Sequence, residues 1–148
     1  MAMTPEARKR LIVGIVIAIA LFGPLLLISG PVMSWAEDHA VENRSEEWAA
    51  DLMMRCAKVY AWTLRPGSEL ACYERMYAEF AESRWRGYAK FMIASCMEKD
   101  HDRSKQRTAD AYEDFILEFQ NDEKFQTLPE WQYYLDEADR AIQRLGVN

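Results

Sequence analysis

Apolar residues form one uninterrupted stretch near the start of the chain. Residues 11–28, LIVGIVIAIALFGPLLLI, contain no charged or strongly polar side chain. As an α-helix these 18 residues rise about 27 Å, close to the thickness of the hydrocarbon core of a bilayer. The pattern predicts a transmembrane anchor over residues 11–29.

Charges on either side of this run orient it. Residues 8–10 (RKR) precede it, whereas Glu37 and Asp38 follow it. The positive-inside rule then predicts that residues 1–10 are cytoplasmic and that the rest of the chain is exported. In a bacterium this describes a single-pass inner-membrane protein with a periplasmic domain. Cleavage of residues 1–36 as a signal peptide is the alternative, because SWA at its end has the small residues that a signal peptidase accepts.

Beyond the anchor, the spacing of apolar residues predicts helices only. Residues 30–45 begin with a Gly-Pro pair and lack sustained periodicity, so we predict a linker there. From residue 46 to residue 148 apolar residues recur at intervals of three and four, and no segment alternates as a half-buried strand does. The predicted fold class is all-α, an anchor followed by about five helices. These helices are expected near residues 46–64, 68–82, 84–99, 106–119 and 129–145.

Two of the predicted helices carry nearly the same nine residues. Residues 72–80 read CYERMYAEF and residues 111–119 read AYEDFILEF. The helices that precede them also correspond, at an offset of 40 rather than 39, since Cys56 aligns with Cys96. Such a duplication predicts two similar helical hairpins and a closing helix, with the Tyr and Phe of each phrase packed inward and its Glu residues in water.

This pattern resembles the tetratricopeptide repeat, in the divergent form found in periplasmic envelope-assembly and Tol–Pal coordinator proteins. The best-matching stretch is residues 88–119, where Phe91, Ala94, the turn 98–102 and Phe119 occupy the places that the family's motif requires. His101 replaces the usual turn glycine, and the period of 39 to 40 exceeds the ordinary repeat of about 34 residues. The resemblance implies a scaffold that binds other proteins and has no catalytic activity of its own.

Catalytic and metal-binding motifs are lacking. The only histidines, His39 and His101, have no nucleophile in a recognisable motif beside them. The three cysteines form no CxxC pair, so we expect no metal, no cofactor and no enzyme activity. After the apolar run the chain carries 23 acidic and 15 basic residues. This balance is unfavourable for nucleic acid and favours protein partners.

The cysteines suggest a covalent link between helices. Cys72 lies as far from one predicted turn as Cys56, and as far from the next turn as Cys96. Equal distance from a turn places residues side by side in an antiparallel hairpin, so Cys72 could form a disulfide with either neighbour in an oxidising compartment. Three small buried thiols without a bridge are the alternative.

The resemblance also indicates candidate binding residues. In the family the first helix of each repeat lines a concave groove, and the matching positions here are Trp48, Asp51, Arg55, Lys58, Phe91, Ser95 and Glu98. Trp48 and Phe91 could instead belong to the core. Because a small array cannot easily bury so many aromatic residues, we also expect exposed aromatic contacts at Trp131, Tyr133 and Tyr134.

Two functions follow as expectations. The first is a membrane-anchored periplasmic adaptor that binds other membrane or periplasmic proteins, or a second copy of itself, and contacts the bilayer through its anchor. The second is an accessory subunit of a respiratory, photosynthetic or transport complex, held by its span as well as by its helical domain.

Overall fold

Residues 30–147 are described by a computed structural model. The chain divides into the units Met1–Trp35 and Ala36–Asn148. The predicted anchor, residues 11–29, lies outside the described residues. Between residues 30 and 147, no helix combines the length and the apolar character needed to cross a bilayer.

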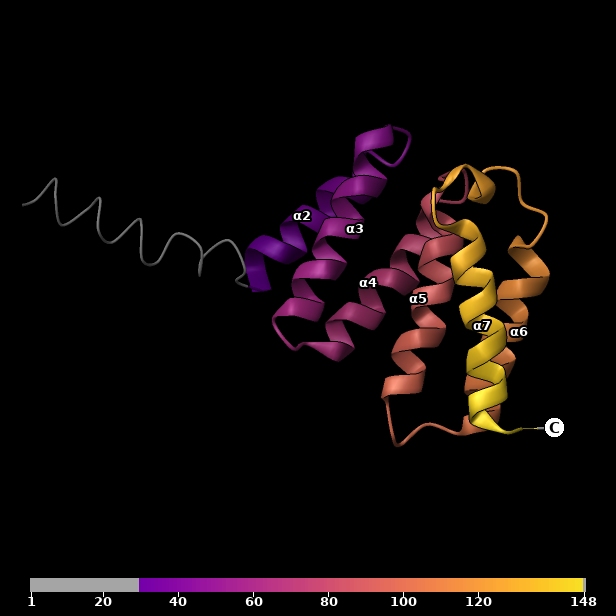
Figure 1. The fold of residues 1–148 in the computed structure, drawn as a ribbon. Helices are drawn as coiled ribbons and strands as arrows, with labels where there is room; N and C mark the ends of the chain where they lie inside the picture. Colours follow the sequence, from indigo (N-terminus) through magenta and orange to yellow (C-terminus); the bar gives the residue numbers. More distant parts are fainter. Residues whose placement is uncertain (1–29, 148) are drawn as a thin grey trace, which may run out of the picture. The chain divides into compact units, whose positions relative to one another are not determined.

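Helices account for the regular structure of the described part (Figure 1). They are α2 (Gly30–Glu42), α3 (Glu47–Trp62), α4 (Pro66–Glu79), α5 (Trp85–Lys99), α6 (Lys105–Phe119), the 3-10 helix η1 (Phe125–Thr127) and α7 (Trp131–Leu145). The all-α prediction is therefore confirmed for residues 30–147, and the five predicted helices correspond to α3 through α7.

Local chemistry explains where several of these helices start and stop. α4 begins with Pro66 rather than at Ser68, because proline fits the first helical turn, where its missing N–H would have no partner. Ser83 lies just before α5, and its hydroxyl accepts a hydrogen bond of 3.2 Å from the backbone N–H of Trp85. α7 ends at Gly146, whose φ of 63° is the left-handed conformation that glycine adopts at low cost.

Most of the segment 30–45 is helical, where the sequence predicted a linker. Its Gly-Pro pair starts α2 instead of breaking it, because proline fits the first helical turn, where its missing N–H would have no partner. Polar contacts hold the second half of α2 to its neighbours: the Tyr60 hydroxyl donates to Glu37 at 2.6 Å, and Arg75 pairs with Asp38 at 2.7 Å. Apolar periodicity does not report contacts of this kind, so the pattern missed this helix.

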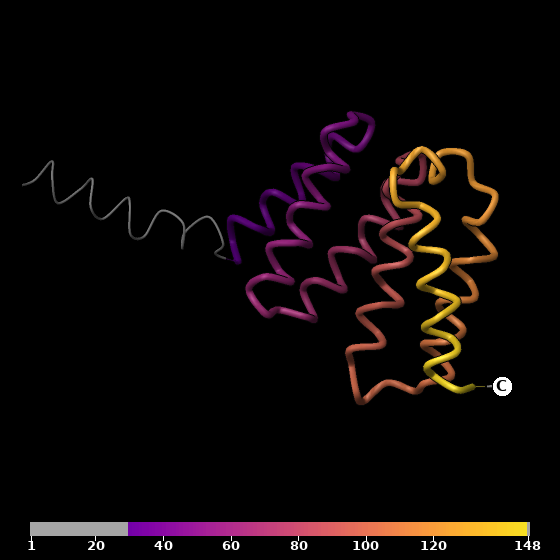
Figure 2. Tube along the Cα trace, viewed as in Figure 1, coloured from indigo at the N-terminus to yellow at the C-terminus, as the bar shows by residue number. Residues whose placement is uncertain are grey.

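From α3 to α7 the helices form a stack of antiparallel neighbours. The chain reverses direction at each turn, so that α3 and α4 form one hairpin and α5 and α6 form the next (Figure 2). Each helix packs mainly on the helix that precedes or follows it, and thinner contacts join α3 to α5 and α5 to α7. The first helices of successive hairpins therefore face a shared side.

The core has two parts that meet at α5. Between α3 and α4 lie Met53, Tyr73 and Met76, each at most 1% exposed. A larger cluster, dominated by phenylalanine, joins α5, α6, η1 and α7. Tyr73 meets the edge of Tyr88 at a ring-centroid distance of 6.1 Å, which connects the two parts.

η1 is an element that the sequence did not predict. It lies in a polar stretch and contributes Phe125, whose ring lies 5.6 Å from that of Phe115 and 5.7 Å from that of Phe119. This ring rests directly on Gly87 of α5, where an added Cβ would lie 2.5 Å from an atom of Phe125. Gly87 is thus required by the close approach of η1 rather than by any turn.

The repeated nine-residue phrases have equivalent environments. Tyr73 and Phe80 in the first phrase, and Tyr112 and Phe119 in the second, are at most 3% exposed. The glutamates of both phrases face solvent. The predicted inward and outward positions are confirmed, so the duplication reflects how the two hairpins pack.

Candidate functional site

The first helices of the two hairpins, α3 and α5, line a small groove together with α7, and we call it the inner groove. Its volume is about 250 Å³. The lining residues come from α3, α5, α7 and the loop before α7: Met54, Lys58, Trp85, Tyr88, Leu128, Pro129, Glu130 and Tyr134. Aromatic rings and a methionine form most of its wall, and one cation and one anion lie in it.

Trp85 joins two of these helices. Its indole N–H donates to the carboxylate of Asp51 across α3 and α5, at 2.5 Å. Its ring meets the edge of Tyr88 at 6.0 Å, and the Arg84 guanidinium lies 5.1 Å from the ring centroid. Because the ring is fixed from both α3 and α5, its position does not depend on an occupant of the groove.

The α7 side of the inner groove is held by Tyr134. Its ring packs 5.3 Å from Tyr88 and 5.2 Å from Phe91, and its hydroxyl donates to Glu130 at 3.0 Å. Burial and this hydrogen bond raise the pKa of Tyr134 above its ordinary value, so the hydroxyl remains a neutral donor at physiological pH. Lys58, on the opposite side, is exposed.

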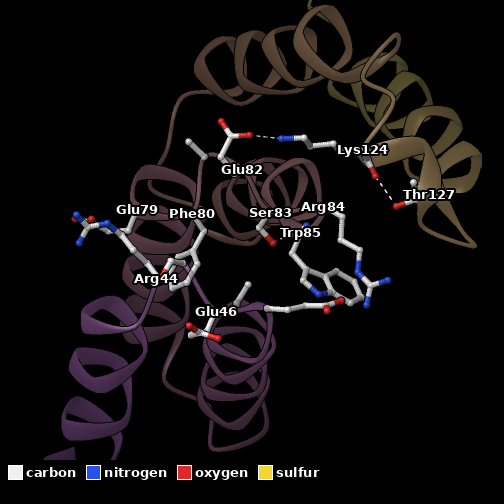
Figure 3. Close-up of a pocket in the computed structure, with 14 residues that line it drawn as sticks. Arg44, Glu46, Glu79, Phe80, Glu82, Ser83, Arg84, Trp85, Lys124 and Thr127 are labelled. Atoms are coloured by element: carbon white, nitrogen blue, oxygen red, sulfur yellow. Dashed lines mark hydrogen bonds and ion pairs between the residues drawn. The ribbon is translucent and has the colours of Figure 1, made fainter.

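A larger cavity of about 730 Å³ lies among the α2–α3 turn, the α4–α5 turn and η1 (Figure 3). Trp85 lines this cavity as well as the inner groove. An ion pair between Lys124 and Glu82 ties η1 to the α4–α5 turn at its edge. The remaining charges in its wall have both signs, including Arg44, Arg84 and Glu79, so no single class of ion is favoured there.

The four residues of α3 that were predicted to line a groove differ in their surroundings. Asp51 is half-buried and engaged by Trp85, and Lys58 lines the inner groove. Arg55 is exposed on the same helix. Trp48 lines neither of the two cavities: its ring, 44% exposed, lies 5.5 Å from that of His39 on α2.

On α5 the prediction requires correction. Phe91 is 7% exposed and packs against Tyr112 and Phe115, so it is a core residue, which was the alternative reading of the sequence. Ser95 is half-buried and interacts with the Tyr112 hydroxyl. The repeat aligns these positions with Asp51, Arg55 and Lys58 of α3, but α6 and α7 cover this face of α5, whereas the same face of α3 leaves Arg55 and Lys58 exposed.

Glu98 links three helices. Its carboxylate accepts a hydrogen bond of 2.8 Å from the buried hydroxyl of Tyr112 on α6. Arg144 of α7 pairs with the same carboxylate at 3.1 Å and with Glu137 at 2.8 Å. These bonds join α5 to α6 and α7.

Of the three aromatic residues predicted to be exposed on α7, one is. Tyr133 is 54% exposed. Trp131 and Tyr134 are half-buried and pack against the C-terminal core. The helix places only one of three neighbouring aromatic side chains on its outer face.

The three cysteines are free and buried, so neither of the predicted disulfides is formed in the structure. Cys72 lies on α4 and its thiol donates to the backbone carbonyl of Met53 on α3 at 3.5 Å. Burial raises the pKa of Cys56 to about 11 and that of Cys96 to about 12, and it also raises the pKa of Cys72. All three thiols are therefore protonated at physiological pH.

We expect these thiols to react slowly while the protein is folded. Because only the thiolate reacts, a pKa of about 11 in place of 9.0 lowers the reactive fraction of Cys56 at pH 8 by about a hundredfold. Alkylation at pH 8, followed by mass spectrometry, should be at least this much slower in buffer than in urea. Burial of the protonated thiols also makes the stability of the fold depend on pH, because the pKa values of these thiols are higher in the folded than in the unfolded chain. The contribution of the buried thiols to stability is complete below about pH 9 and is lost as the pH rises towards 11 to 12. Rapid alkylation of any one thiol in the folded protein would contradict this environment.

Several groove residues were missed by the sequence reading. Trp85, Glu130 and Pro129 lie at helix starts, where periodicity gives no indication of a role. The repeat offset of 40 does align Tyr88 with Trp48, so the duplication itself pointed to Tyr88 as the α5 counterpart of a residue predicted to line the groove.

No group of three or more His, Cys, Asp or Glu side chains suited to holding a metal ion is found in the part of the chain that the structure describes. Comparison of the chain with protein-family models, with curated proteins and with solved structures finds no match.

Proposed function

We propose that this chain is a membrane-anchored adaptor of the bacterial inner membrane. Residues 11–29 hold it in the bilayer, and its periplasmic, tetratricopeptide-like domain docks onto a segment of another envelope protein without catalysis of its own. The observation that carries the proposal is the inner groove, which is built jointly by α3, α5 and the start of α7.

The chemistry of the inner groove suits a protein segment. Tryptophan, tyrosine and methionine are enriched where proteins bind one another, since they offer large contact areas at low entropic cost. Lys58 and Glu130 supply charges of opposite sign that can set the direction in which a segment lies. Trp85 and Tyr134 are held by Asp51 and by neighbouring rings before any partner arrives, which lowers the cost of binding.

The size of the inner groove favours the same reading. Cavities that enclose small molecules typically measure about 300–1,000 Å³. At about 250 Å³ this groove holds one or two side chains of a longer segment rather than a whole metabolite. Helical-repeat proteins bind extended segments along such surfaces.

Charge reversal at Lys58 tests the proposal. Lys58→Glu should reduce the capture of a specific partner from mild-detergent extracts by at least about tenfold, because it removes the only cation of the groove and adds repulsion. The measurement is affinity purification of the tagged full chain with quantitative mass spectrometry. Lys105→Glu, at an exposed lysine on α6, is the matched control and should leave capture unchanged. Equal capture by the wild type and Lys58→Glu would contradict docking through the inner groove.

A second comparison separates the adaptor from an accessory subunit held by its span. Residues 11–28 are replaced by an unrelated apolar sequence of the same length, with the domain unchanged. Association that survives this exchange assigns the partner to the periplasmic domain. Association that is lost assigns it to the span and contradicts the adaptor.

A further inference from the structure

The turn between α3 and α4 exposes two large apolar side chains. Trp62, the last residue of α3, is 77% exposed, and Leu64 is 87% exposed. Only Thr63 separates them, and Arg65 follows. We call residues 62–65 the α3–α4 tip. Single exposed apolar residues are ordinary, but a tryptophan and a leucine that are both exposed two positions apart concentrate apolar surface at one turn.

Leu64 also occupies an unfavourable backbone conformation. Its φ is 56°, and it is the only non-glycine with positive φ among residues 30–147. The N–H of Leu64 donates to Ala61 and that of Arg65 to Tyr60, at 3.2 and 2.9 Å, which is the helix-ending motif whose left-handed position is usually glycine. A leucine here is strained and almost fully in water, so folding does not account for it.

Charges around the tip are basic, although the chain as a whole is acidic. Between Asp51 and Glu74 the exposed charged side chains are Arg55, Lys58 and Arg65, and the one acid in this interval, Glu69, is buried. The carboxylates on the adjoining part of α2 are both paired with a cation, because Arg75 lies 3.7 Å from Glu37 and 2.7 Å from Asp38. A tryptophan, a leucine and nearby cations are the groups that associate with a bilayer interface.

Little chain lies between the predicted span and the residue of α2 that the α3 end contacts. Tyr60, two residues before Trp62, bonds to Glu37 of α2. Eight residues lie between Glu37 and Ile28, the last residue of the apolar run. That interval covers about 13 Å as a helix and about 30 Å fully extended. A connection of this length is short enough to allow the turn to reach the lipid headgroups at the end of a span.

We infer that the α3–α4 tip inserts Trp62 and Leu64 into the outer interface of the bilayer, with Arg65 among the lipid phosphates. The tip is a second membrane contact beside the anchor and would fix the tilt of the domain, and with it the direction in which the inner groove opens. The inference rests on the anchor in the proposed function, since without a span nothing brings the tip to a membrane.

The test measures how deeply the tip reaches into lipid. The full chain carries Leu64→Cys, or Leu117→Cys as a matched control at an exposed leucine of α6, 72% exposed. Each is labelled with an environment-sensitive fluorophore, and the wild-type chain, whose thiols are buried, gives the background. Both are reconstituted in nanodiscs of phosphatidylcholine and phosphatidylglycerol, with and without brominated acyl chains. The label at position 64 should be quenched by the brominated lipid at least severalfold more than the label at position 117, with emission shifted to the blue.

Flotation of the same reconstituted samples separates this inference from the proposal on which it rests. Flotation with the lipid, together with stronger quenching at position 64, supports the inserted tip. Flotation with equal quenching at the two positions overturns the tip and leaves the anchored adaptor intact. Failure of the full chain to float overturns the anchor and the inserted tip together.

Discussion

Replacing Phe125 by alanine should lower the free energy of unfolding by about 3–5 kcal/mol, the usual cost of removing a fully buried phenylalanine. Phe125 is 1% exposed and packs against Phe115, Phe119 and Tyr134 at ring-centroid distances of 5.6, 5.7 and 6.3 Å. No other side chain of η1 is buried, so nothing nearby fills the void. Urea unfolding of the full chain in mild detergent, followed by tryptophan fluorescence, measures the change.

Gly87 provides an internal control for the same contact. Gly87→Ala alone should cost about 1–3 kcal/mol, because the new methyl group would overlap the Phe125 ring. In the Phe125→Ala background the methyl group has room, and the cost of Gly87→Ala should fall by more than half. Additive effects of the two substitutions, or a cost below about 1 kcal/mol for Phe125→Ala, would show that η1 does not pack on α5 in solution.

Replacing Glu98 by alanine should lower the free energy of unfolding by about 2–3 kcal/mol. The larger part comes from Tyr112, because a buried hydroxyl left without an acceptor costs about 1–3 kcal/mol. The exposed pair with Arg144 adds at most about 1 kcal/mol. The same denaturation experiment measures the change, and partner capture by the folded protein should remain as in the wild type.

Two controls identify the cause of this effect. Tyr112→Phe in the Glu98→Ala background removes the unsatisfied hydroxyl and should recover about half of the loss. Glu113→Ala, at an exposed glutamate of α6, should change the free energy of unfolding by less than about 0.5 kcal/mol. If Glu98→Ala instead weakened capture while stability was unchanged, Glu98 would be a docking residue, as its place in the repeat first suggested.

Much of the helical architecture could be read from local signals. Apolar spacing located α3 through α7, because each buries one face against a neighbouring helix and must repeat its apolar residues at that face. Gly146 marked the end of α7 through a conformation that glycine tolerates. The duplicated phrases predicted which tyrosines and phenylalanines are buried.

The elements that were missed depend on contacts between distant residues. α2 buries Met33 and Ala40, but Glu37 lies between them, and Glu37, Asp38 and Arg75 form polar pairs that apolar spacing does not report. η1 has a single buried residue, Phe125, and one residue cannot establish a period. Its position over Gly87 exists only once α5 and α6 have packed together.

The candidate site shows the same limit at the level of side chains. Position in the repeat grouped Lys58 with Glu98, yet Lys58 is exposed in the inner groove whereas Glu98 is bonded to Tyr112 and Arg144. A repeat alignment identifies equivalent places on equivalent helices. It does not report that α6 and α7 cover this face of α5, whereas the same face of α3 leaves Lys58 exposed.

The sequence by itself determined the helical class, the extents of α3 through α7 and the inward face of each repeated phrase, because these follow from the helical period and from the backbone preferences of glycine and proline. Only the tertiary structure decided which polar and aromatic residues face the inner groove, which close the core and which remain in water at the α3–α4 tip. That outcome depends on how the helices pack around α5, and burial by a neighbouring helix is not a property of any single stretch of sequence.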